Sequence, residues 1–164
     1  MVGAPGSGKS YLGAILAEAI GAENIQTDAV RKELFPAPRY TPGEAAAVYG
    51  TCHHRIREGL AEGKRIVFDG TNLAERRRHT LYALADEAGA TLVIVAAYAP
   101  ESVIRARLNQ RATARTPGDV SDADWTIYLR MRGDAEPIGR PHIIANTVAG
   151  ADPVVRLVCR LVDA

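Results

Sequence analysis

Residues 3–10, with the sequence Gly-Ala-Pro-Gly-Ser-Gly-Lys-Ser, have the residue types and the spacing of a phosphate-binding loop. They match the pattern G-x-x-x-x-G-K-S/T at every fixed position. The glycines allow turns in which successive backbone N–H groups point at phosphate oxygens. Lys9 brings a compact positive charge to the outer phosphates, and the Ser10 hydroxyl can ligate Mg²⁺. We therefore expect this segment to bind a nucleotide, with contacts from Gly3, Ala4, Pro5, Gly6, Ser7, Gly8, Lys9, Ser10 and Tyr11.

Two aspartates follow short β-type runs and are the next candidates for chemistry. Residues 24–26 predict a strand with Asp28 and Arg31 just beyond its carboxyl end, where open α/β sheets bind their ligands. Residues 64–69 predict a buried strand that ends in Asp69, and an acid at this place commonly faces the metal or its waters. Phosphoryl transfer needs a base near the attacking hydroxyl, and Asp28 suits that role. The competing interpretation of Asp28 is a helix N-cap, because Asp is a favoured cap.

Residues 105–115 contain several arginines and no acidic residue. Arg107 and Arg111 are four residues apart, so they share one face of the helix predicted to start at Pro100. This face is either solvated or part of a lid around residues 105–120 that clamps the γ-phosphate. The nearby phosphate loop favours the lid, since a guanidinium group can pair with two phosphate oxygens at once.

Other polar groups are interpreted as structural. His53 and His54 are adjacent on a predicted helix and point about 100° apart, so they do not easily share a metal ion. For residues 76–78, three successive arginines, a solvated helix face is favoured over phosphate contact. Cys52 and Cys159 are far apart in the sequence and are expected to be buried thiols in a reducing compartment.

The elements that must position these residues alternate between β-type runs and amphipathic helices. This alternation predicts an α/β fold with a parallel sheet covered by helices on both faces. The first helix is expected to stop at Gly21, and the next long helix to run from the Thr41 cap, with Glu44 in a capping box, to near Gly63. A helix over 73–88 follows, with Asn72 and Glu75 as capping candidates, and then a central strand over 90–97 and the helix after Pro100. The last expected elements are a helix capped by residues 121–124 with Trp125, Tyr128 and Leu129 in the core, a strand at 143–146, and a helix capped by Asp152.

The first strand is unusually short, because only Met1 and Val2 precede the phosphate loop. Typical strands have about five to six residues. Two residues are expected to leave backbone N–H and C=O groups of a central strand without partners. We therefore expect the first strand to be truncated and the natural start to lie upstream.

The composition is that of one globular domain over residues 1–164, with 47% hydrophobic residues and a net charge of +1. This charge gives no global attraction to nucleic acid or membranes, so anion binding must come from local clusters. The sequence shows no signal peptide and no apolar run that could span a bilayer, so a cytoplasmic protein is expected.

The sequence resembles the P-loop kinases that group with polynucleotide 5′-hydroxyl kinases and zeta-toxin-like kinases, an AAA-type ATP-binding kinase domain. The resemblance covers nearly the whole chain and rests on the phosphate loop, Asp28-x-x-Arg31, Asp69-x-Thr-Asn72 and Arg107-x-x-x-Arg111. It implies a five-stranded parallel sheet of order 2-3-1-4-5. It also implies that Asp28 is the general base and that Arg31 holds a phosphate of the acceptor next to the reacting hydroxyl.

The expected function is an ATP- and Mg²⁺-dependent kinase that acts on a hydroxyl acceptor, either a polynucleotide 5′-hydroxyl or another phosphate-bearing molecule. The alternatives are a small-molecule or sugar-nucleotide kinase of zeta-toxin type and an ATP-binding switch module without catalysis. The expected roles are catalysis by Lys9, Asp28, Arg107 and Arg111, acceptor binding by Asp28 and Arg31, and metal binding by Ser10 and Asp69. A monomer or weak dimer without a membrane partner is expected.

Overall fold

The computed structural model describes residues 1–113 and 123–163. The elements in chain order are α1 (Lys9–Ile20), β1 (Glu23–Gln26), α2 (Thr27–Leu34), α3 (Pro42–Ala61), β2 (Ile66–Asp69), α4 (Glu75–Glu87), β3 (Val95–Tyr98), α5 (Glu101–Thr113), α6 (Trp125–Gly133), β4 (Ile143–Asn146) and α7 (Asp152–Val162). The expected outer end of the lid and the expected caps at 121–122 lie outside the described residues.

The strands pair in parallel, as the alternation of elements predicts. β1 pairs with β2, with Gln26 opposite Asp69, and β3 pairs with β4, with Tyr98 opposite Asn146. The described pairings therefore form two separate two-stranded sheets. The five-stranded order stays a prediction.

Met1 and Val2 lie between these two sheets. Val2 forms a parallel bridge to β3, where it donates to the carbonyl of Val95 (2.8 Å) and accepts from the N–H of Ala97 (2.8 Å). On the other side, the nitrogen of Met1 donates to the carbonyl of Phe68 in β2 (2.9 Å). The expectation that the backbone groups of these two residues would lack partners is therefore wrong for each group named here.

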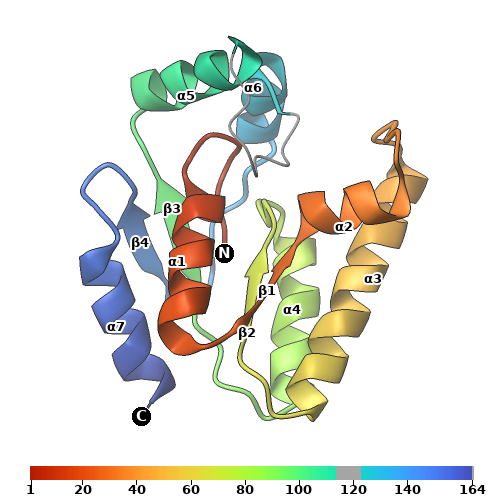
Figure 1. Cartoon of the computed structure of the whole chain (residues 1–164), viewed down its shortest axis with the longest axis vertical. Helices are drawn as coiled ribbons and strands as arrows, with labels where there is room; N and C mark the ends of the chain where they lie inside the picture. The colour runs from red at the N-terminus through yellow and green to blue at the C-terminus, as the bar shows by residue number, and fades with distance from the viewer. Residues whose placement is uncertain (114–122, 164) are drawn as a thin grey trace.

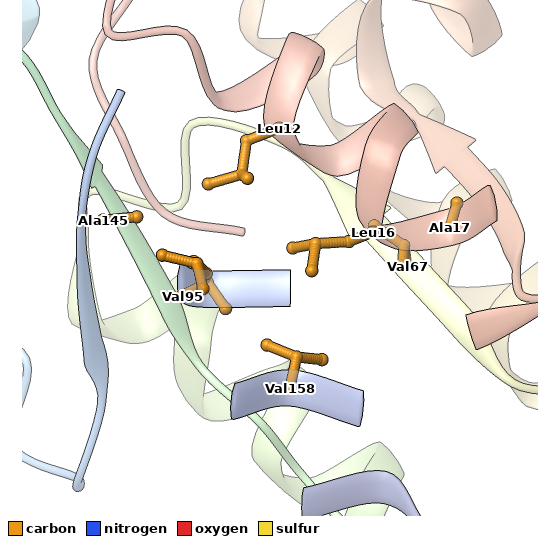
Figure 2. Close-up of a cluster of buried hydrophobic side chains, with 8 residues drawn as sticks. Leu12, Leu16, Ala17, Val67, Val95, Ala145 and Val158 are labelled. Atoms are coloured by element: carbon orange, nitrogen blue, oxygen red, sulfur yellow. The ribbon is translucent and has the colours of Figure 1, made fainter. Parts of the chain in front are cut away.

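Helices cover both faces of the strands, as predicted (Figure 1). On one face α1 and α7 pack on β2, β3 and β4, and Figure 2 shows this core, formed by Leu12, Leu16, Ala17, Val67, Val95, Ala145, Val154 and Val158. On the other face α3 and α4 pack on β1 and β2 through Ile25, Val48, Cys52, Ile56, Phe68 and Leu84. The adjacent residues Val67 and Phe68 point to opposite faces because side chains alternate along a strand.

Several predicted boundaries agree with the structure. Gly21 ends α1 in the left-handed conformation, with φ of 62°. The hydroxyl of Thr41 accepts from the N–H of Glu44 (3.2 Å) and caps α3. Asp124 caps α6 by accepting from the N–H of Ile127 (2.8 Å).

Other local predictions are wrong. The N-caps of α4 and α7 are Ala74 and Ala151, neither with a side-chain cap, rather than Asn72 and Asp152. The strand expected over 90–97 is confined to Val95–Tyr98, because only this part has a parallel partner in β4. Leu129, expected in the core, is exposed on α6, whereas Tyr128 is buried.

No helix in the two described segments is long and apolar enough to cross a membrane.

Candidate active site

The carboxyl ends of the strands meet at one edge of the molecule, and the predicted site residues lie in the segments that follow them. Figure 1 shows this edge at the top, with α1, α2 and α5 starting from it. The phosphate loop follows Val2, Asp28 follows β1, Asp69 ends β2, and Thr147 follows β4. This arrangement agrees with the rule that open α/β sheets bind ligands at the carboxyl ends of their strands.

Gly6 and Gly8 give the phosphate loop its shape. Both have positive φ, 76° and 87°, a conformation that residues with a Cβ atom rarely adopt. Packing excludes a side chain as well, because a Cβ atom on Gly8 would lie 2.8 Å from the hydroxyl oxygen of Thr147. Gly8 precedes the first residue of α1 and has no side-chain cap, so the first N–H groups of that helix face the loop.

Hydrogen bonds hold the loop to its surroundings on both sides. The N–H of Gly3 donates to the carbonyl of Thr71, which follows β2 (3.0 Å), and the N–H of Ser7 donates to Ala4 within the loop (3.1 Å). The hydroxyl of Thr147 donates to the carbonyl of Ser7 (2.7 Å). The loop is therefore held between the segments that follow β2 and β4.

Lys9 lies between the two predicted metal ligands. Its ammonium is 3.5 Å from Oδ1 of Asp69, which is buried, and 3.4 Å from the hydroxyl of Ser10. Oδ1 of Asp69 has no hydrogen-bond partner. The carboxylate of Asp69 and the hydroxyl of Ser10 thus both lie next to one positive charge, and both are oxygen donors of the kind that Mg²⁺ prefers.

Mg²⁺ fits these donors. In the described part of the chain no three His, Cys, Asp or Glu side chains form a metal-binding group, and Mg²⁺ sites are usually built from one or two carboxylates together with substrate phosphates. Ser10 and Asp69 would hold the ion, which supplies charge neutralisation for the phosphates.

Asn72 and Arg78 form a buried support beneath the site that was not predicted from the sequence. Asn72 has φ of 47°, is 1% exposed, and donates through Nδ2 to the carbonyl of Met1 (2.8 Å). Arg78 is also 1% exposed, so the solvated face predicted for it is wrong. Its guanidinium donates to Glu75 and to the carbonyls of residues 72, 73, 136 and 137 at 2.6–3.1 Å. This one cation therefore ties the loop after β2 to the segment after α6.

Arg107 is attached to the phosphate loop. It projects from α5, and its Nη1 donates to the carbonyl of Gly6 (3.2 Å) and to the hydroxyl of Thr147 (3.0 Å). Arg111 lies half-buried in the last turn of the same helix. The structure thus brings Arg107 to the nucleotide loop, and the contact of both arginines with a γ-phosphate stays a prediction.

Asp28 and Arg31 lie in α2, directly after β1. Asp28 is half-buried in the first helical turn, and the N-cap position is held by Gln26, so the N-cap interpretation of Asp28 is wrong. Arg31 is 9% exposed, and its Nε and Nη1 have no hydrogen-bond partner. The pairing of Gln26 with Asp69 places the start of α2 next to the end of β2.

Comparison with protein families assigns the chain. The model of the family described as "AAA domain" matches residues 1–137. The chain belongs to this AAA domain family.

Solved structures with the same fold include proteins that bind nucleotides. A protein from Chloroflexus aurantiacus assigned as a kinase superposes with a TM-score of 0.75 at 18% identity, covering 97% of this chain and 95% of that one. The Mycobacterium tuberculosis APS kinase in complex with AMPPNP and APS gives 0.74 at 15% identity, with 99% and 95% covered. Kti12 of Chaetomium thermophilum in complex with ADP-AlF3 gives 0.74 at 16% identity, with 98% and 96% covered. These similarities show a P-loop NTPase-like α/β fold.

Curated relatives are longer proteins. Uncharacterized proteins of Mycobacterium tuberculosis and Mycobacterium bovis are 30% identical over 149 residues, which cover 79% of this chain. The match spans 30% of the length of these relatives.

Two contributors to the site were missed in the sequence because they belong to no local motif. Thr147 follows the last strand, so the carboxyl-end rule applied to β4 would have indicated it. Arg78 carries no such signal, since its neighbours Arg76 and Arg77 have the same residue type. Only the packing of α4 against residues 136–137 distinguishes it.

Burial shifts the pKa values of the adjacent residues Cys52 and His53 in α3. Burial raises the pKa of the Cys52 thiol to about 11, with nearby Arg55 and Arg31 opposing the rise. Burial also lowers the pKa of His53, with the charges of Arg57 and Arg77 acting in the same direction. Cys159, predicted to be buried, is only half-buried.

Proposed function

We propose that this chain is an ATP- and Mg²⁺-dependent kinase that transfers the γ-phosphate of ATP to a hydroxyl acceptor. The observation that carries the proposal is the meeting of two chemistries at one sheet edge. The phosphate loop supplies Lys9 and Ser10, and Asp69 lies 3.5 Å from the ammonium of Lys9. The adjacent strand end supplies Asp28, a carboxylate in the first turn of α2 that is not the N-cap of this helix.

In the proposed reaction the acceptor oxygen attacks the γ-phosphorus while its proton passes to Asp28. The bond between the γ-phosphorus and the β–γ bridging oxygen breaks, and ADP leaves with the electron pair. Lys9 stabilises charge on the outer phosphates, and Arg107 and Arg111 act as lid residues on the transferring group. Arg107 must release the carbonyl of Gly6 and the hydroxyl of Thr147 to reach that group, because its Nη1 donates to both.

The acceptor class we favour is a molecule that carries its own phosphate, such as a polynucleotide 5′ end or a nucleotide-like molecule. The buried Arg31, with its unpaired Nε and Nη1, supports an anionic acceptor over a neutral one. A small-molecule or sugar-nucleotide kinase of zeta-toxin type is the alternative acceptor class. We also propose a single domain with a five-stranded sheet of order 2-3-1-4-5, which the contacts of Met1 and Val2 to both sheets support.

A nucleotide switch without transfer is the second candidate. Its support is the attachment of α5 to the phosphate loop through Arg107 and Thr147, which would couple nucleotide binding to the position of that helix.

One experiment separates the kinase from the switch. γ-Labelled ATP is incubated with the protein and, in turn, with 5′-hydroxyl oligonucleotides, nucleosides, sugars and aminoglycosides. Label recovered in an acceptor, and lost with Asp28→Asn, supports the kinase. Nucleotide binding without label in any acceptor would support the switch. ATP hydrolysis alone is not decisive, since kinases also transfer slowly to water.

A further inference from the structure

The guanidinium of Arg31 has only part of the compensation that a buried cation needs. Glu44 is the carboxylate within ion-pair distance in the described residues, at 3.9 Å from Nη1. The oxygens of Glu44 already accept from the backbone N–H groups of Arg39 (2.9 Å) and Tyr40 (2.7 Å). A buried donor without a partner costs about 1–3 kcal/mol, so an added anion would be bound favourably here.

A second cation lies close to the loop after β2. The guanidinium of Arg77 in α4 is 3.9 Å from the ring centroid of Tyr49 in α3, and the side chain is half-buried. Burial raises the pKa of Tyr49, and the Arg77 charge and hydrogen bonding from Thr71 and Arg77 oppose the rise. Thr71 itself accepts from Gly3 at the start of the phosphate loop. Arg77 is therefore connected to the start of the phosphate loop through Tyr49 and Thr71.

Three successive arginines of α4 have three different environments. Arg76 is exposed to solvent, and every donor of the Arg78 guanidinium has a protein acceptor. Arg77 is half-buried, and no carboxylate among residues 1–113 and 123–163 lies within ion-pair distance of it. Its contacts are the ring face of Tyr49 and a hydrogen bond to the same side chain, which orient the guanidinium and leave its remaining N–H donors for an anion.

Both cations pack against the first half of one helix. Arg31 faces Glu44 and Arg77 faces Tyr49, and these two positions of α3 are separated by about 7.5 Å along the helix axis. The two positions are also about 140° apart around the helix axis, so one compact ion would not contact both cations, whereas an extended ligand with two anionic groups can.

We propose that Arg77, oriented by Tyr49, is a second cationic contact for the acceptor, so that the preferred acceptor carries two anionic groups. One group pairs with Arg31 and the other with Arg77. The inference rests on the proposed kinase function, because it assigns these cations to the acceptor side of that site.

The test measures binding by calorimetry with the nucleotide site saturated by AMPPNP and Mg²⁺. The probes are adenosine 3′-monophosphate, with one phosphate, and a 5′-hydroxyl adenosine dinucleotide with a 3′-phosphate, with two. Wild type is expected to bind the dinucleotide more tightly. Arg77→Gln should weaken dinucleotide binding about 10- to 100-fold and leave monophosphate binding nearly unchanged. The matched control is Arg76→Gln, which should bind both probes like wild type.

Equal binding of the two probes by wild type, or no binding of either, would overturn the proposal. So would an Arg77→Gln variant that weakens both probes equally, because that pattern indicates a structural role. If Arg77→Gln does not fold, Tyr49→Phe keeps the ring, removes the hydroxyl, and should give a smaller loss that is again confined to the dinucleotide. An unchanged dinucleotide affinity in Tyr49→Phe would then count against the proposal.

The same materials distinguish this inference from the kinase proposal. Dinucleotide binding that depends on Arg77, without γ-phosphate transfer to the 5′-hydroxyl, would support the anion site and contradict the proposed kinase activity. Transfer to the dinucleotide with an unchanged rate and an unchanged KM in Arg77→Gln would support the kinase and overturn the anion site.

Discussion

The proposed nucleotide side and the proposed acceptor side of the site differ in which buried polar atoms have no hydrogen-bond partner. On the nucleotide side these atoms are oxygens: the hydroxyl of Ser7, Oδ1 of Asp69 and Oδ1 of Asn72. On the acceptor side they are the N–H groups Nε and Nη1 of Arg31. Unpaired oxygens suit a cation, and unpaired N–H groups suit an anion. The difference therefore supports a metal–nucleotide complex on one side and an anionic acceptor on the other.

The two sides also differ in how they are fixed. Backbone atoms determine the nucleotide side, through the positive φ of Gly6 and Gly8 and the bond from Thr147 to Ser7. Side chains determine the acceptor side, through Arg31 and Arg77 against one helix. A site built from backbone is rigid and general for phosphates, whereas one built from side chains can vary with the acceptor.

The largest expected effect is that of Lys9→Ala. Removing this ammonium takes a positive charge from the outer phosphates, and transfer should fall by on the order of 10³ or more. The measurement is the rate of label transfer from ATP, with circular dichroism to show that the fold is intact. Lys64→Ala, an exposed lysine before β2, is the control and should keep the wild-type rate. Near wild-type turnover in Lys9→Ala would contradict the assignment of Lys9 and the phosphate loop to the nucleotide.

Substitution of Asp28 and of Asp69 should change the kinetics differently, because Asp28 is assigned to the acceptor side and Asp69 to the nucleotide side. Asp28→Asn removes the base and should lower turnover by roughly 10²–10⁴ at unchanged ATP affinity. Asp69→Asn weakens the metal site and should shift the Mg²⁺ concentration needed for half-maximal activity. Titrating Mg²⁺ against both variants checks the assignment, and exchanged responses would refute it.

Thr147→Val should have a smaller effect, confined to the nucleotide side. The valine keeps the shape but removes the hydroxyl that donates to Ser7 and accepts from Arg107. Nucleotide affinity is expected to fall by about tenfold, since such hydrogen bonds contribute about 1–2 kcal/mol. The acceptor KM should be unchanged. The exposed Thr126→Val on α6 is the control, and an equal loss in both variants would contradict a specific role for Thr147.

The smallest expected effect concerns stability at high pH. Burial raises the pKa of the Cys52 thiol from 9.0 to about 11 in the folded state. The unfolded chain therefore releases this proton first as the pH rises, so stability falls between these two values. We expect the free energy of unfolding, measured with urea, to fall less between about pH 8 and about pH 10 in Cys52→Ala than in wild type. Cys159→Ala is the control, and an unchanged pH dependence in Cys52→Ala would contradict the assignment.

The elements of the fold could largely be predicted from the sequence. The apolar spacing, Gly21, and the Thr41 cap with Glu44 mark helices that the structure contains. The extent of the strand at 95–98 could not be predicted, because the apolar run over 90–97 does not show where β4 pairs with it. Likewise, no local pattern shows that Val2 bridges to β3 while Met1 contacts β2.

The sequence by itself determined the phosphate loop, because Gly6, Gly8, Lys9 and Ser10 act through local backbone geometry and fixed spacing. Only the tertiary structure decided the environments of Arg76, Arg77 and Arg78, which have the same residue type and follow one another in the sequence. Arg76 is exposed, Arg77 lies on the ring of Tyr49, and Arg78 is buried among the carbonyls of the preceding loop and those of the distant residues 136 and 137. The physical reason is that a buried charge is defined by the partners that surround it, and those partners come from distant segments.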